Sequence, residues 1–297
     1  MSESNTRRKA GRASLWLIAA ATCAAAAAPL KPNFHTNWNA IYPSSQTDDN
    51  VIAGTGSSCQ LCHQSSSGGD GYNAYGWQVW QAWNAGASVS NAIVMAEPFD
   101  SDGDGASDVF EIDAGTQPGW KPGNTNTIHF KNGSTQNNQS PPSGILGSLN
   151  PACGTAVGYC TPGTSASGCQ ASLSTSGTPS ASSGSGFLLS ATSVEGAKDG
   201  LYFFGVNGRQ ANAWGNGTSL QCVTPPVKRA GLLNGTGTSG LCDGTFSQDL
   251  NAVWAANPSK NPGGGALVQA QLWYRDPQNT SNQTTSLSDA VEFLVCP

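Results

Sequence analysis

Residues 265–274 read GALVQAQLWY and residues 290–296 read AVEFLVC. Each run is short, apolar or alternating, and bounded by turn-forming residues, which is the pattern of a β-strand. Comparable runs occupy residues 186–193, 200–206 and 220–224. Repeated short strands without a long helical pattern are typical of a β-sandwich. We therefore predict an all-β sandwich over residues 146–297, with a short helix over 286–290 as its one exception.

This half of the chain carries six cysteines. An even number of cysteines in an oxidising compartment predicts three disulfides, and spacing alone allows fifteen connectivities. A metal site is the weaker alternative because no histidine follows His129. The same lack removes the commonest general base, and no nucleophile set or phosphate loop is recognisable. The six residues are Cys153, Cys160, Cys169, Cys222, Cys242 and Cys296.

Residues 122–145 differ in composition from both flanking regions. They are rich in Asn, Thr, Gln, Ser, Gly and Pro, with hardly a hydrophobic run, and so predict a polar linker. A length of 297 residues leaves room for two modest domains. We therefore predict a second, amino-terminal domain over residues 29–121.

Within residues 29–121, the run from Cys59 to His63 has the pattern C-x-x-C-H. Two thiols three positions apart can each form a thioether to a porphyrin, while the adjacent imidazole ligates the iron. The alternatives are a small disulfide or half a zinc site, but a zinc site needs further Cys or His partners nearby. The motif predicts haem c bound covalently through Cys59 and Cys62, with His63 on the iron.

The sixth iron ligand has few candidates. Met95 leads because it lies downstream of the motif on a predicted helix, and a thioether ligand raises the reduction potential. Core packing is the alternative role for Met95. His35 or His129 could ligate instead, and a five-coordinate iron would favour ligand binding or peroxidase-like chemistry.

Two helices are predicted after the motif, over residues 72–85 and 88–96. Gly86 ends the first, and Ser88 or Ser90 can cap the second. Aromatic side chains recur every three residues in the first helix and predict a broad face that packs against haem, with an ordinary aromatic core as the alternative. Those residues are Trp77, Trp80 and Trp83, with Tyr75 nearby.

The segment from Pro32 to Trp120 contains ten acidic residues and no Lys or Arg. Nucleic acid is therefore excluded as its partner, because phosphate binding needs basic residues. A bound cation or a basic protein partner is expected instead.

Residues 100–111 match the twelve-residue calcium-loop pattern position by position. Gly105 permits the sharp turn, and Ser107 departs from the aliphatic residue that pairs two EF-hand loops. A solvated acidic turn is the alternative. The predicted calcium ligands are Asp100, Asp102, Asp104, the carbonyl of Ala106, Asp108 directly or through water, and Glu111 with both oxygens.

The amino terminus has the pattern of a secretory signal peptide over residues 1–28. Arg7, Arg8, Lys9 and Arg12 precede an apolar stretch that ends in an alanine run, and the stretch is short for a membrane span. Lipid attachment at Cys23 is a weaker alternative because the preceding residues make a poor lipoprotein signal. We predict export to the periplasm or cell surface, with no transmembrane segment after the signal is removed.

Three resemblances extend these predictions. The amino-terminal half resembles c-type cytochromes through Cys59, Cys62 and His63, with Asn73 and Gly76 as weak support, which implies a small α-helical cytochrome c-like module. The acidic loop resembles the single, unpaired calcium loops of dockerins and thrombospondin type 3 repeats.

The third resemblance concerns the carboxy-terminal half from Tyr159 onwards. Its segments 202–205, 215–222, 272–277 and 287–290 and the terminal Cys296 and Pro297 resemble a domain that closes many secreted bacterial proteins. The resemblance implies a disulfide-linked β-sandwich without an established activity. It also implies the pairs Cys160–Cys296 and Cys222–Cys242, which leaves Cys153 with Cys169.

These observations together predict an exported monohaem c-type cytochrome that transfers electrons to or from a redox protein. Calcium would hold its amino-terminal module together, and the sandwich would localise it by contacting a surface polymer or another protein. The competing hypotheses are a surface-binding or adhesion protein with structural haem, and an enzyme that works at an open haem.

Overall fold

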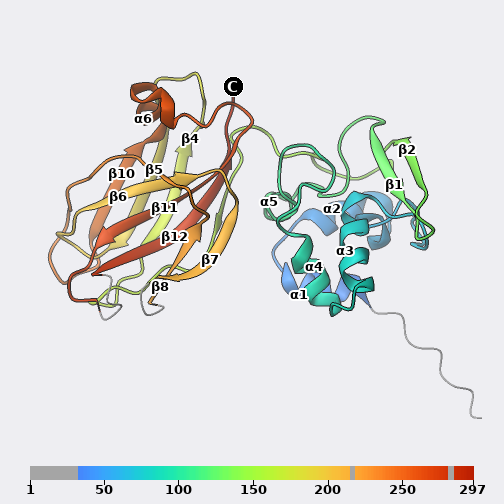
Figure 1. The fold of residues 1–297 in the computed structure, drawn as a ribbon, viewed down its shortest axis with the longest axis horizontal. Coiled ribbons are helices and arrows are strands. Elements are labelled where there is room, and N and C mark those ends of the chain that lie inside the picture. The colour runs from blue at the N-terminus through green and yellow to red at the C-terminus, as the bar shows by residue number, and fades with distance from the viewer. Residues whose placement is uncertain (1–32, 215–217, 280–283) are drawn as a thin grey trace, which may run out of the picture. The chain divides into compact units, whose positions relative to one another are not determined.

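Strands of the carboxy-terminal half form two antiparallel sheets that face each other (Figure 1). The computed structural model describes residues 33–214, 218–279 and 284–297. The predicted signal peptide and Cys23 lie outside the described residues.

One sheet has five strands and the other has three. The five-stranded sheet has the order β3-β12-β11-β6-β9, made by β3 (Ala156–Tyr159), β12 (Thr285–Leu294), β11 (Leu267–Arg275), β6 (Gly200–Gly205) and β9 (Lys228–Arg229). The three-stranded sheet has the order β10-β5-β4, made by β10 (Gly244–Asp249), β5 (Phe187–Val194) and β4 (Ser172–Gly177). The hairpin of β7 (Arg209–Trp214) and β8 (Ser219–Val223) pairs separately.

The main hydrophobic core lies between the two sheets. Strand β6 contributes Tyr202 and Phe204, and strand β5 contributes Phe187 and Leu189 from the opposite side. Because successive side chains of a strand point to opposite faces, Phe203 joins a second apolar cluster on the outer face of β6. The strands predicted from the sequence are therefore present and are organised as a β-sandwich.

Two local predictions in this half are wrong. The helix expected over residues 286–290 is part of β12, where Leu287 pairs with Trp273 of the neighbouring strand; tertiary pairing overrides the weak helical pattern. A helix that the sequence did not predict, α6 (Leu250–Ala256), begins after Asp249, whose side chain accepts a hydrogen bond from Ala252 N. Its seven residues are too few for a clear helical period.

The six cysteines form three disulfides, as predicted, but all three implied pairs are wrong. Strands β3 and β12 are antiparallel, with Tyr159 opposite Ala290 and Ala156 opposite Phe293. Continuing this register brings Cys153, not Cys160, opposite Cys296. The observed disulfides are Cys153–Cys296, Cys160–Cys222 and Cys169–Cys242.

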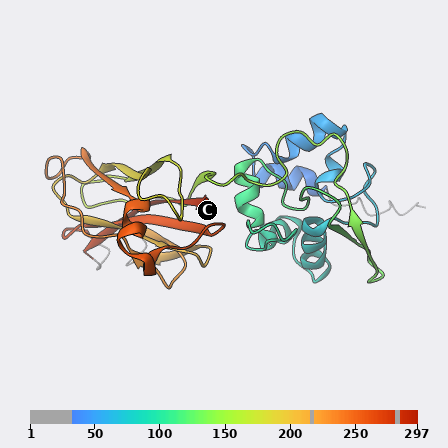
Figure 2. The same cartoon turned by 90° about the horizontal axis from the view of Figure 1, so that it is seen from above.

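Upstream of these sheets, short helices alternate with loops and end in a β-hairpin. The hairpin of β1 and β2 lies beside the helices in both views (Figure 1 and Figure 2). Its strands lie within the predicted linker of residues 122–145. The elements are α1 (Phe34–Ile41), α2 (Thr47–Thr55), a 3₁₀ helix at Ser58–Leu61, α3 (Ala74–Asn84), α4 (Val89–Ala96), α5 (Asp108–Ala114), β1 (Asn126–His129) and β2 (Thr135–Gln139).

The predicted fold class, a small α-helical cytochrome c-like module followed by an all-β sandwich, is wrong. Over the described residues the chain is mostly β, with six short α-helices and twelve strands, and no small helical cytochrome module is evident there. Residues Asn33–Pro297 cluster into one compact unit. The amino-terminal helices do bury a small core that includes Trp38, Tyr75 and Ile93. However, hairpin β1–β2 adds strands to them through a bridge between Tyr72 and His129, and α6 interrupts the β half.

Candidate functional site

The two cysteines of the C-x-x-C-H run are the free thiols among the described cysteines. Cys59 lies within the 3₁₀ helix Ser58–Leu61, and Cys62 directly follows it in the same tight turn. Cys62 N and His63 N both donate to the Cys59 carbonyl, at 3.1 and 2.9 Å. Buried Trp120 donates its indole N–H to the Gln60 carbonyl at 2.8 Å. These hydrogen bonds fix the backbone of the turn, which places both thiols and the imidazole close together.

Asn73 and Gly76 join this turn to helix α3. Asn73 caps the helix by accepting from Gly76 N at 2.8 Å, and its amide donates to the Leu61 carbonyl at 2.9 Å. A Cβ at position 76 would lie 2.1 Å from the Cys62 carbonyl oxygen, so only glycine allows this approach. The asparagine and glycine singled out by resemblance thus position α3 against the cysteine turn.

His63 and Cys59 both face Gly68. A Cβ built on Gly68, whose φ is +70°, would lie 3.7 Å from Cys59 Sγ and 3.8 Å from His63 Nε2. His63 Nδ1 is buried and has no hydrogen-bond partner among the described residues. Burial lowers the pKa of His63, while the Gly71 carbonyl acts in the opposite direction. A neutral imidazole beside a thiol is suited to ligating a metal through Nε2.

The Cys62 thiol is held in its protonated form. Burial raises its pKa to about 12, with the nearby Cys59 adding to the rise. A zinc site, the alternative interpretation of these thiols, would need further Cys or His ligands beside them. Among the described residues, the side chains that converge closely enough to hold an ion lie in the acidic loop instead.

Aromatic rings gather next to His63. The Tyr72 ring lies 4.5 Å from the His63 ring, centroid to centroid, and the rings of Trp77 and Trp80 stack at 4.6 Å. His129 stacks on Trp77 at 5.3 Å. Both tryptophans are half-buried, so this aromatic cluster leaves apolar surface exposed that a ligand could cover.

The three candidate distal ligands occupy different places. Met95 is 56% exposed on α4, and His35 Nε2 lies 3.0 Å from Asp48 Oδ2. His129 belongs to the aromatic cluster, and isolated bridges connect His63 to Tyr72 and Tyr72 to His129. Sequence patterns do not indicate that His129 joins this cluster, since it lies in a polar stretch far along the chain.

The acidic loop brings its first three carboxylates together. Oxygens of Asp100, Asp102 and Asp104 lie within 4.8 Å of one another. Asp100 accepts hydrogen bonds from the backbone N–H groups of Gly103, Asp104 and Gly105 at 2.8–3.0 Å. Gly105 has a φ of +99°, a value that favours glycine and produces the sharp turn expected there.

Glu111 and Asp108 enter the loop from α5. Glu111 is fully buried, and neither of its carboxylate oxygens has a hydrogen-bond partner in the described part of the chain; Asp102 Oδ2 shares this property. Asp108 instead accepts from Ser101 N and Ser101 Oγ, at 3.0 and 2.7 Å. Unpartnered buried oxygens are costly in a folded protein, and a calcium ion takes six to eight oxygen ligands of this kind.

The electrostatics of the loop are those of crowded buried acids. Burial first, and then the neighbouring Asp104 and Asp100, raise the pKa of Asp102 to about 7. Burial also raises the pKa of Asp108 to about 8 and that of Glu111 well above its ordinary value. Sequence reasoning missed Lys121, the residue that directly follows the segment without basic residues. Its ammonium group donates a hydrogen bond to the Asp102 carbonyl.

No protein-family model matches this sequence, and comparisons with curated proteins and with solved structures find no match. The functional argument therefore rests on the residues themselves. Two further observations bear on where the protein works. Three disulfides are typical of an oxidising compartment outside the cytoplasm, and none of the described helices is long and apolar enough to cross a membrane.

Proposed function

We propose that this chain is an exported protein that carries one covalently attached haem and transfers electrons at the periplasm or cell surface. The observation that carries the proposal is the contrast among its cysteines. Six described cysteines pair as disulfides, while Cys59 and Cys62, next to His63, are free. Their spacing suits two thioethers to one porphyrin. The fold around them is not that of a small helical cytochrome.

The residues around the motif support a haem in three ways. Cys59 and Cys62 would hold it covalently, and His63 would ligate its iron through Nε2. The Cys59 thiol and the His63 imidazole both face Gly68, which has no side chain to cover them. Tyr72, Trp77 and Trp80 would cover apolar porphyrin surface. When bound, haem supplies a one-electron couple whose potential depends on its axial ligands and on burial.

The loop from Asp100 to Glu111 is proposed to bind calcium as a structural staple. Its support is the convergence of three carboxylates and the buried, unpartnered oxygens of Glu111. Extracellular calcium keeps even a weak site filled. Bound calcium would offset part of the negative charge of the loop, and a redox partner with a basic surface would complement the rest.

The test is a denatured pyridine haemochrome spectrum with intact mass, on protein secreted by a host with c-type haem maturation. We expect one covalent haem per chain. The variant with both Cys59→Ser and Cys62→Ser should carry none, whereas Cys169→Ser, which breaks a disulfide, should keep it. A wild-type mass without haem would refute the proposal and favour a surface-binding role for the sandwich.

A further inference from the structure

Two strands of the five-stranded sheet carry apolar side chains on both faces. In β6, Leu201 and Phe203 point away from the main core, and Trp273 of β11 does the same. The register places Trp273 directly between Leu201 and Leu287 of the neighbouring strands. The outer face of the sheet therefore has its own apolar row, which needs a cover.

The hairpin β7–β8 provides that cover and is held by polar bonds. Fully buried Gln271 accepts from Cys222 N at 3.0 Å and donates to the carbonyls of Leu220 and Ser288 at 2.8 and 2.7 Å. The disulfide Cys160–Cys222 adds a covalent link to the end of β3. These bonds fix the hairpin against the sheet, where Val223 packs with Phe203 and Leu287.

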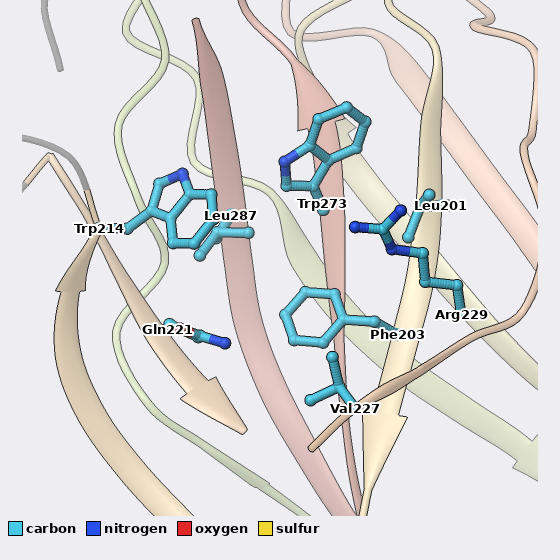
Figure 3. Close-up of a pocket in the computed structure, with 8 residues that line it drawn as sticks. All are labelled: Leu201, Phe203, Trp214, Gln221, Val227, Arg229, Trp273 and Leu287. Atoms are coloured by element: carbon cyan, nitrogen blue, oxygen red, sulfur yellow. The ribbon is translucent and has the colours of Figure 1, made fainter. Parts of the chain in front are cut away.

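A cavity of about 220 Å³ lies at the other end of the hairpin (Figure 3). Phe203, Trp273 and Leu287 line it from the sheet, and Trp214 lines it from the hairpin. Trp214 is oriented by its indole N–H, which donates to Thr285 Oγ1 at 3.0 Å. A cavity of about 150 Å³ accepts benzene, so this one has room for a six-membered ring with a small substituent.

Two polar groups at this cavity have no partner among the described residues. Arg229 lies directly opposite Phe203 in the sheet, and in Figure 3 its guanidinium group points toward the rings of Phe203 and Trp273. Gln221 reaches the cavity from β8. An unpaired guanidinium offers two parallel N–H donors, which match a carboxylate.

We propose that this cavity binds a small carboxylic acid with an aromatic or alicyclic ring. The ring would lie between the indoles of Trp214 and Trp273, and the carboxylate would meet Arg229. A sugar fits less well because hydroxyl groups against Leu201 and Leu287 would lack hydrogen-bond partners. A preformed apolar cavity with few polar groups is the usual form of a small-molecule site.

Isothermal titration calorimetry of the full-length secreted protein tests this proposal. The probes are benzoate and cyclohexanecarboxylate, with neutral benzamide and maltose for comparison. We expect saturable one-site binding of at least one carboxylate, weakened roughly 10- to 100-fold by Arg229→Gln, as for loss of a charged hydrogen-bond partner. Leu201→Trp, which fills the cavity, should abolish binding.

The matched control is Lys228→Gln, which removes the same charge from the adjacent residue of β9, whose ammonium instead donates to the Ser259 carbonyl. It should leave binding unchanged, and circular dichroism with intact mass should show that each variant is folded with its disulfides. The proposal is overturned if neither carboxylate binds at millimolar concentration, if benzamide or maltose binds as well as they do, or if both charge variants behave alike.

Discussion

Replacing Glu111 with glutamine should have opposite effects with and without calcium. The Glu111 carboxylate is fully buried, and both oxygens lack hydrogen-bond partners among the described residues. Without a cation, this unpaired acid opposes folding by an amount on the order of 1–3 kcal/mol, the usual cost of an unsatisfied buried group. The Glu111→Gln variant should therefore be more stable than the wild type in chelator, because a neutral amide is less costly to bury.

With calcium the order should reverse. Binding to the folded state alone stabilises a protein by RT ln(1 + [Ca²⁺]/Kd), or about 2.7 kcal/mol at a hundredfold excess. For a chain of this size that corresponds to a rise in Tm of roughly 5–10 °C. Glu111→Gln removes the last carboxylate of the loop, so we expect the variant to lose most of this rise.

Differential scanning fluorimetry in EGTA and in a calcium series measures both effects. Asp49→Asn is the matched control, since it removes one charge from an exposed acid on α2 and should keep the full calcium response. A wild-type Tm that does not depend on calcium would refute the calcium site. Equal calcium responses in wild type and Glu111→Gln would refute the role assigned to Glu111.

Three other perturbations have defined outcomes. His129 lies in the same aromatic cluster as His63. If haem is bound, we therefore expect His129→Gln, rather than Met95→Leu, to give the oxidised protein a high-spin absorption spectrum. Loss of a methionine-to-iron charge-transfer band in Met95→Leu would support Met95 instead. Alanine at both Cys153 and Cys296 should lower the free energy of unfolding by about 2–5 kcal/mol, seen as a lower denaturant midpoint, and an unchanged midpoint would contradict it. Asp249→Ala should cost about 1 kcal/mol at neutral pH as a lost helix cap. Burial raises the pKa of Asp249, but hydrogen bonds from backbone N–H groups lower it overall from 3.8. The greater stability of the wild type should therefore be present above pH 4 and vanish as the pH falls through the lowered pKa. A stability difference that persists in acid would argue against the charged cap.

The features that could be predicted from the sequence are those whose parts are close along the chain. The cysteine turn spans five residues and the acidic loop spans twelve, so their groups must lie together whatever the rest of the fold does. The helix boundaries near Gly86 and Ser88 depend on local capping and were also predicted correctly. Five strands were predictable because alternation of apolar side chains is a local pattern.

The features that the sequence did not indicate depend on residues far apart in the chain. Disulfide partners follow from the register of β3 against β12, which a composition pattern does not contain, so all three pairs implied by resemblance were wrong. His129 joins the aromatic cluster next to His63 only because hairpin β1–β2 pairs with Tyr72. The apolar cavity forms where hairpin β7–β8 covers side chains of β6, β11 and β12. Residue spacing determines which groups within a short segment lie together. Strand register and the packing of the hairpins are decided only when distant strands bury their side chains together.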